Sequence, residues 1–80
     1  MKVTLEKFLD IVGESFIETY LCEIYVDEYD EDFEEYFPKK EVDCVKNLNQ
    51  LNPYMNYEIY GFDQKVEWGE IVLQTIWLRE

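Results

Sequence analysis

The chain has 80 residues and a formal net charge of −12, because it holds 19 Asp and Glu against 7 Lys and Arg. Such an excess of negative charge repels naked nucleic acid and anionic membrane surfaces, and it favours cationic partners. A hydrophobic content of 48% argues against intrinsic disorder, which needs low hydrophobicity together with high net charge. We therefore predict one compact domain that spans residues 1–80.

The predicted location follows from segments that the sequence lacks. No apolar run approaches the roughly 18 residues that cross a membrane, and no apolar signal core follows Lys2. We expect a cytoplasmic protein that binds no membrane. In that compartment, Cys22 and Cys44 are expected as buried thiols rather than as a disulfide.

The first predicted element is a helix that follows Thr4, a residue whose side chain suits the N-cap position. Its buried face is formed by the i, i+3, i+4, i+7 series Leu5, Phe8, Leu9 and Val12. Gly13 stands where a glycine commonly ends a helix.

Two periodicities compete in residues 14–26. A helical face is formed by Ile17, Tyr20, Leu21 and Ile24, whereas one face of a strand is formed by Phe16, Tyr20, Cys22, Ile24 and Val26. The many β-branched and aromatic residues favour the strand, with the helix as the alternative.

A short acidic helix is predicted from Asp30 to the residue before Pro38. Asp30 suits the N-cap, and the helix dipole favours Glu31 and Asp32 in the first turn. The apolar stripe of this helix is formed by Phe33, Tyr36 and Phe37. Pro38 disfavours helical geometry in the residue before it, so the helix is expected to stop there.

Shorter elements are predicted in the second half of the chain. Val42, Cys44 and Leu48 alternate as a short strand, and the Asn-rich residues 47–56 read as a loop. A strand is expected over residues 57–62, with a turn at Asp63 and Gln64 and a continuing hairpin strand over residues 66–68.

The most apolar segment follows Gly69, which interrupts the pattern. Residues 71–78 predict a central strand that is buried on both faces at Val72, Leu73, Ile76 and Trp77. Together, the elements predict a small α+β domain. Its N-terminal helix and its short acidic helix would pack on a three- to four-stranded, mainly antiparallel sheet.

The sequence offers few residues for catalysis or metal binding. The chain has no His, and its three glycines are isolated, so it offers no imidazole base, no Ser-His or Cys-His pair and no phosphate-binding loop. Asp30, Asp32 and Glu34 alternate like calcium ligands, but Glu35 occupies the sixth position, where a calcium loop needs Gly. We predict no catalytic residue, no metal site and no cofactor.

The acidic run from Asp27 to Glu35 holds seven carboxylates in nine residues and no basic residue. As a helix it would carry about one charge per 2 Å, against about one per 1.7 Å of B-DNA axis. As an extended chain it would carry about one per 4 Å, close to the ~3.4 Å of a single strand. Three interpretations remain open: nucleic-acid mimicry, another protein-binding role, and a face that only keeps the domain soluble.

A resemblance rests on this run and its aromatic neighbours. The residues that carry it are Glu23, Asp27, Glu28, Tyr29, Asp30, Glu31, Asp32, Glu34, Glu35 and Tyr36. In length, acidity and this interleaving, the chain resembles small phage- and mobile-element-encoded inhibitors of the anti-CRISPR and anti-restriction type, several of which mimic DNA. The stretch 30–37 with 41–43 also resembles a segment of small Firmicutes phage proteins.

The resemblance implies a Cas effector or another DNA-binding enzyme as the partner. Our hypothesis is a non-enzymatic inhibitor whose ten residues above bind the basic groove that holds DNA or the PAM, without direct nucleic-acid binding. If the gene belongs to a phage, the protein would act in the host cytoplasm. The alternative is an acidic interaction module or regulatory subunit that binds through an aromatic face between Tyr54 and Trp68.

Overall fold

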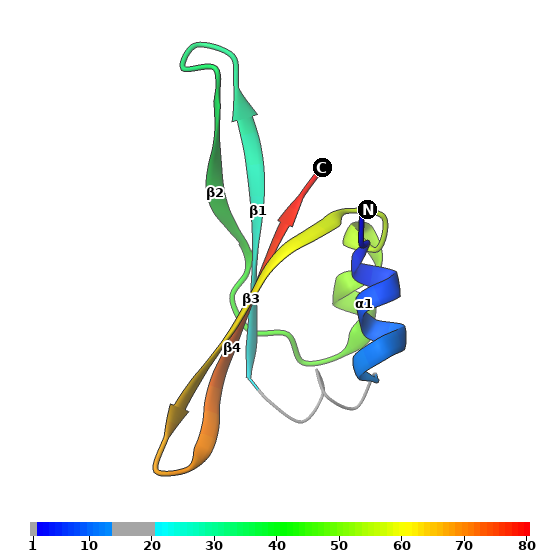
Figure 1. The fold of residues 1–80 in the computed structure, drawn as a ribbon, viewed down its shortest axis with the longest axis vertical. Helices are drawn as coiled ribbons and strands as arrows, with labels where there is room; N and C mark the ends of the chain where they lie inside the picture. The colour runs from blue at the N-terminus through cyan, green and yellow to red at the C-terminus, as the bar shows by residue number, and fades with distance from the viewer. Residues whose placement is uncertain (1, 14–20) are drawn as a thin grey trace.

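The fold is seen in a computed structural model that describes residues 2–13 and 21–80. Its elements in chain order are α1 (Leu5–Val12), β1 (Cys22–Asp30), β2 (Glu35–Val42), the 3₁₀ helix η1 (Leu48–Tyr54), β3 (Glu58–Glu67) and β4 (Glu70–Arg79). The strands form one sheet in the order β2-β1-β4-β3 (Figure 1). The prediction of an α+β domain is therefore confirmed.

The sheet is mixed, so the prediction of a mainly antiparallel sheet is wrong. Two antiparallel hairpins, β1–β2 and β3–β4, lie side by side, and their inner strands β1 and β4 pair in parallel. The cause is the connection between the hairpins, which leaves the sheet at β2, passes through η1 and returns at the opposite edge as β3. Parallel neighbours need such a long crossover, whereas a tight turn joins only antiparallel strands.

Helix α1 matches its sequence signals. The Thr4 side chain accepts a hydrogen bond from the backbone N–H of Lys7 at 3.2 Å, and Gly13 ends the helix with φ +87°. Leu5 and Leu9 are buried against the sheet. Since each fully buried Leu contributes roughly 1.5–3 kcal/mol, these two residues account for much of the attachment of the helix.

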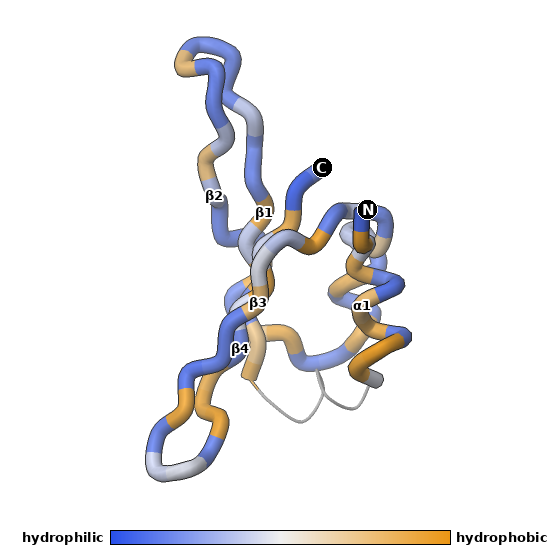
Figure 2. Tube along the Cα trace, viewed as in Figure 1, coloured by the Kyte–Doolittle hydropathy of each residue, from blue (hydrophilic) through white to orange (hydrophobic). Residues whose placement is uncertain are grey.

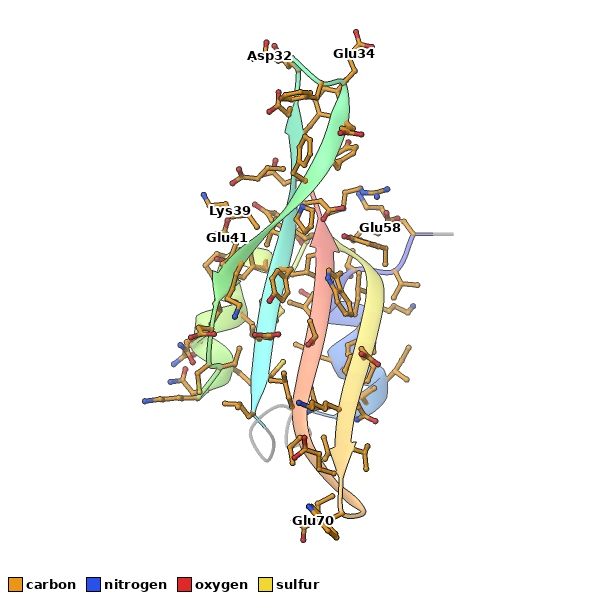
Figure 3. All side chains as sticks on the ribbon, turned by 90° about the vertical axis from the view of Figure 1, so that its left-hand side faces the viewer. Asp32, Glu34, Lys39, Glu41, Glu58 and Glu70 are labelled. Carbon is orange, nitrogen blue, oxygen red and sulfur yellow. The ribbon has the colours of Figure 1, made fainter. Side chains whose placement is uncertain are left out.

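The core lies between the sheet and one covering layer. Figures 1 and 3 show α1 and η1 on the same side of the sheet. Alternate residues of β1 point into this core at Cys22, Ile24 and Val26. This alternation confirms the strand interpretation for residues 22–26. Residues 14–20 lie outside the described part of the chain. The remaining core residues are Leu5, Leu9, Val45, Leu51, Ile76 and Leu78.

The predicted acidic helix does not form, because Asp30 ends β1 and Glu35 begins β2. Asp30 Oδ1 still accepts a hydrogen bond from the Asp32 N–H at 2.9 Å, but the bond closes a turn rather than capping a helix. In a helix, like charges four residues apart repel each other. This run would hold four such pairs: 27/31, 28/32, 30/34 and 31/35. Extension separates them.

Pro38 lies inside β2 rather than ending a helix, which is tolerated because β2 is an edge strand. The strand predicted through Cys44 and Leu48 is also wrong. β2 ends at Val42, and Leu48 begins η1, which replaces much of the predicted loop. Asn47 and Gln50 form a capping box that fixes the start of η1.

The turn predicted at Asp63 and Gln64 is wrong, because β3 continues through both residues. The chain turns instead at Trp68 and Gly69, which have φ +56° and +76°. Two consecutive residues of positive φ are typical of a tight hairpin turn whose twist matches the strands.

Strand β4 confirms the predicted central strand, because it lies between β1 and β3. Ile76 is fully buried, and Leu73 and Trp77 are half-buried. Val72 is 38% exposed, so its predicted burial is wrong. Cys22 and Cys44 are both free thiols; Cys22 is buried, as predicted, and Cys44 is half-buried.

The Trp68 backbone is in a conformation that costs an ordinary L-residue roughly 1–2 kcal/mol and that Asn tolerates. Trp68 is fully exposed, so its replacement loses no buried surface. We expect Trp68→Asn to raise the free energy of unfolding by about 1 kcal/mol in urea titrations at low protein concentration. The matched change Gly69→Ala should lower it, since the added Cβ meets no atom but the positive φ becomes strained.

Candidate functional site

The acidic run forms the outer half of the β1–β2 hairpin, which extends beyond the rest of the sheet (Figure 1). The last paired residues of β1 and β4 are Asp27 and Arg79, whereas β1 and β2 stay paired as far as Asp30 and Glu35. The outer hairpin therefore has no strand beside it except its own partner. Asp32 and Glu34 are labelled at its end in Figure 3.

Most of the carboxylates on this hairpin are exposed. The exposed acids are Glu28, Glu31, Asp32, Glu34 and Glu35, and Asp30 is half-exposed. Figure 2 shows the outer hairpin mostly in the hydrophilic colour, with few apolar positions. We call these six residues the acidic ladder.

The cation nearest to the acidic ladder is Lys39 of β2. Its Nζ lies 3.3 Å from Glu28 Oε1 and 3.8 Å from Glu41 Oε1. A hydrogen bond to Glu28 raises the pKa of Lys39. Because the Lys39 and Glu28 side chains are well exposed and that of Glu41 is partly exposed, such ion pairs contribute little stability. The negative charge of the ladder is left largely uncompensated.

Asp27 was predicted to bind the partner, but the structure places it in an internal contact. Its side chain is buried on the uncovered face of the sheet, with Oδ2 3.5 Å from Arg79 Nη2. The Tyr60 hydroxyl donates a hydrogen bond to Asp27 Oδ1. The Arg79 guanidinium also lies 4.7 Å from the Tyr36 ring centroid and 4.8 Å from that of Tyr60. Asp27 is therefore already neutralised within the fold.

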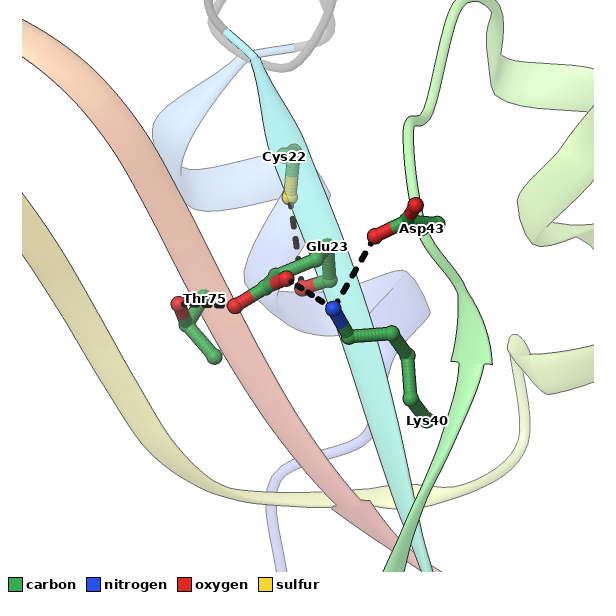
Figure 4. Close-up of polar contacts among 5 residues, drawn as sticks. All are labelled: Cys22, Glu23, Lys40, Asp43 and Thr75. Atoms are coloured by element: carbon green, nitrogen blue, oxygen red, sulfur yellow. Dashed lines mark hydrogen bonds and ion pairs between the residues drawn. The ribbon is translucent and has the colours of Figure 1, made fainter.

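Glu23 was predicted as a binding residue as well, and it too is held internally (Figure 4). Lys40 Nζ lies 2.9 Å from Glu23 Oε2, and the Thr75 hydroxyl donates to Glu23 Oε1 at 3.3 Å. Lys40 also contacts Asp43 at 3.0 Å. Glu23 joins β1, β2 and β4 on the uncovered face and lies apart from the acidic ladder.

Aromatic rings accompany the ladder. Tyr29 and Tyr36 are paired across the hairpin, with ring centroids 5.1 Å apart. Phe33 and Phe37, which were expected to pack a helix onto the core, form a second pair at 5.8 Å. Phe33 is 69% exposed and Tyr29 is 53% exposed. Sequence periodicity missed the exposure of both phenylalanines because it assumed a helix.

A groove of about 500 Å³ lies beside the hairpin. Its acidic lining consists of Glu28, Glu31, Glu41 and Glu80, and its aromatic lining of Tyr29, Tyr54 and Tyr57, with Val26 beneath. The Tyr57 hydroxyl donates to Glu80 Oε1 at 3.0 Å, and this bond raises the pKa of Tyr57. Carboxylates and ring faces both attract cations, so the groove suits a Lys or Arg side chain.

Sequence reasoning missed the groove because its acids come from distant parts of the chain. Glu41 lies farther along β2 and Glu80 at the far end of the sequence, and only the parallel pairing of β1 with β4 brings Glu80 near the run. No sequence spacing could have signalled this approach.

The alternative aromatic face does not form one surface. Tyr54 and Tyr57 line the acidic groove, whereas Tyr60 donates to Asp27 on the uncovered face of the sheet. Trp68 lies at the turn between β3 and β4. The aromatic residues of this segment are thus divided among different regions.

Within residues 2–13 and 21–80, no three His, Cys, Asp or Glu side chains are grouped so that they could hold a metal ion. None of the helices in this described part is both long and apolar enough to span a membrane.

No protein-family model matches this chain, and neither a curated protein nor a solved structure is significantly similar to it. The function must therefore be argued from the geometry above.

The contact between Asp27 and Arg79 generates a stability prediction. Asp27→Asn leaves the Arg79 guanidinium without its carboxylate, and removing one partner of a buried pair is strongly destabilising. Since Arg79 is partly exposed, we expect a loss of about 2 kcal/mol in denaturant unfolding. The same change at the exposed Asp32 should alter stability by less than about 0.5 kcal/mol. Equal effects at both positions would contradict this assignment.

Alkaline pH should test the same contact. Burial and the hydrogen bond to Asp27 raise the pKa of Tyr60 from 10.0 to about 12, and burial raises that of Cys22 from 9.0 to about 12. Folding therefore favours the protonated forms of Tyr60 and Cys22. Their contribution to the free energy of unfolding is complete below the pKa values of the unfolded chain and is lost as pH rises towards 12. In the wild type, the free energy of unfolding should decline above pH 10. We expect Tyr60→Phe to make this decline shallower, so that only the part due to Cys22 remains in unfolding measurements.

Proposed function

We propose that the protein is a non-enzymatic inhibitor that occupies the DNA- or PAM-binding groove of a Cas effector or another DNA-binding enzyme in the cytoplasm. The observation that carries the proposal is the acidic ladder on a hairpin that projects beyond the sheet. A charged surface that served only for solubility could be spread over the whole molecule, with less self-repulsion.

The spacing of the ladder supports mimicry of a nucleic-acid backbone. Residues of an extended strand rise ~3.3 Å each, and paired strands lie ~4.8 Å apart. Consecutive phosphates of one DNA strand are ~3.4 Å apart along the axis. Since successive side chains of a strand point to opposite faces, the carboxylates of Glu28 and Asp30 on β1 are about 6.6 Å apart along the strand, roughly two phosphate intervals. Lys and Arg side chains that hold alternate phosphates would meet these two acids, with the turn acids Glu31, Asp32 and Glu34 and then Glu35 of β2 beyond them.

The exposed rings support the same proposal. Tyr29 and Phe33 lie among the acids of the ladder and are each more than half exposed. In nucleic-acid grooves, Arg side chains and aromatic residues stack on bases, and a protein ring offers them a similar flat surface. The acidic groove would additionally receive one Lys or Arg side chain of the enzyme between the rings of Tyr54 and Tyr57 and the neighbouring glutamates.

Charge reversal at the hairpin tip tests the proposal. We expect Asp32→Lys with Glu34→Lys to weaken competition with duplex DNA at least about tenfold, because it converts ladder acids into repelling cations. The matched control is Glu6→Lys with Asp10→Lys, which changes the net charge equally on the exposed side of α1 and should compete like the wild type.

The measurement is competition for fluorescent duplex DNA on a guide-loaded type II Cas effector and a panel of restriction endonucleases, at low and high salt. Competition that weakens with salt is expected, since the association is electrostatic. If the protein displaces DNA from no enzyme of the panel, or if both double variants lose equally, the proposal is refuted.

A further inference from the structure

The outer edge of β3 is open along most of its length. β4 pairs with β3 on one side. On the other side, the Ile59 N–H donates to the Val3 carbonyl at 2.8 Å, and Thr4 forms a bridge with Glu58. From residue 60 to residue 67, no strand of the described chain pairs with this edge. An open edge of this length is a template for another strand.

The two edges of the sheet differ in how they are protected. β2 at the far edge contains Pro38 and the adjacent Lys39 and Lys40, features that block edge-to-edge pairing. β3 contains no proline, and beyond a bulge at Tyr60 it is regular from Gly61 to Glu67. Its apolar residues and the turn residue that follows are partly or fully exposed: Phe62 37%, Tyr60 45%, Val66 57% and Trp68 100%.

The residues of β3 are self-complementary about Gln64. If two copies pair antiparallel with Gln64 on the two-fold axis, each residue before Gln64 faces the residue that lies equally far after Gln64 in the other copy. Asp63 then faces Lys65 and Phe62 faces Val66, and each pair occurs twice. Opposite charges and apolar pairs directly across two strands each favour pairing.

We propose that the protein forms a homodimer through antiparallel pairing of β3 with β3 of a second copy, centred on Gln64. The contact is the same patch on both copies, as two-fold symmetry requires. It joins two four-stranded sheets into one continuous sheet. Lys65 is available for this contact, since its only described ion pair, with Glu67 at 3.3 Å, is exposed and therefore weak.

Two chains that each carry a charge of −12 repel each other, and the position of the acidic hairpins limits this repulsion. β2 and β3 lie at opposite edges of the sheet. In a β3–β3 dimer, the two acidic ladders are therefore at the far edges, where separation and salt screen their repulsion. The proposal stands independently of the inhibitory function.

Two complementary charge variants test the register. Asp63→Lys alone and Lys65→Glu alone each put like charges opposite each other at both contacts. We expect each variant to raise the dimer dissociation constant at least about tenfold in sedimentation equilibrium. When the two variants are mixed, every contact again joins a Lys to an acid, so a heterodimer should form with nearly wild-type affinity.

The controls are Glu6→Lys and Lys46→Glu, which make the same charge changes outside β3 and should dimerise like the wild type. Circular dichroism checks that each variant is folded. The proposal is overturned if the wild type stays monomeric up to millimolar concentration, or if the mixture of Asp63→Lys and Lys65→Glu remains monomeric.

Discussion

The shape of the molecule depends on where the parallel pairing of β1 with β4 ends, and the contact between Asp27 and Arg79 lies at that position. It joins the last residue pair of the parallel strands β1 and β4. Beyond it, β4 ends, and β1 continues with only β2 beside it. Asp27 is the one acid of the run that this arrangement buries, and Arg79 and Tyr60 satisfy it there. The other six acids lie on the outer part of the β1–β2 hairpin and in its turn, where water solvates them at little cost.

The two hairpins have different exposed surfaces for the same reason. Each extends past the layer formed by α1 and η1, so neither outer half is covered by the core. The outer half of β1–β2 is charged and its edge carries Pro38, a combination that resists strand pairing. The outer half of β3–β4 is more apolar, and its edge residues match a second copy of themselves. The β1–β2 end of the fold thus exposes negative charge, and at the opposite edge most of β3 has no described strand on its outer side.

Features of the fold that depend on interactions between residues close together in the sequence could be predicted, whereas those that depend on residues far apart could not. The cap at Thr4, the stop at Gly13 and the apolar run of β4 act over a few residues, and the structure confirms all three. The acidic segment failed because its helical signals, Asp30 at the cap and acids in the first turn, were judged without the repulsion between acids four residues apart. For the site, the run itself was evident, but the internal roles of Glu23 and Asp27 were not.

By itself, the sequence determined an α+β domain with a buried C-terminal strand and a crowded negative charge near its middle, because composition and short-range periodicity express burial and charge directly. Tertiary structure alone decided that β1 and β4 pair in parallel, that the acids lie on a projecting hairpin, and that Glu41 and Glu80 share a groove with it. These features depend on which strands become neighbours. That choice is made by packing between residues far apart in the chain, for which local spacing carries no signal.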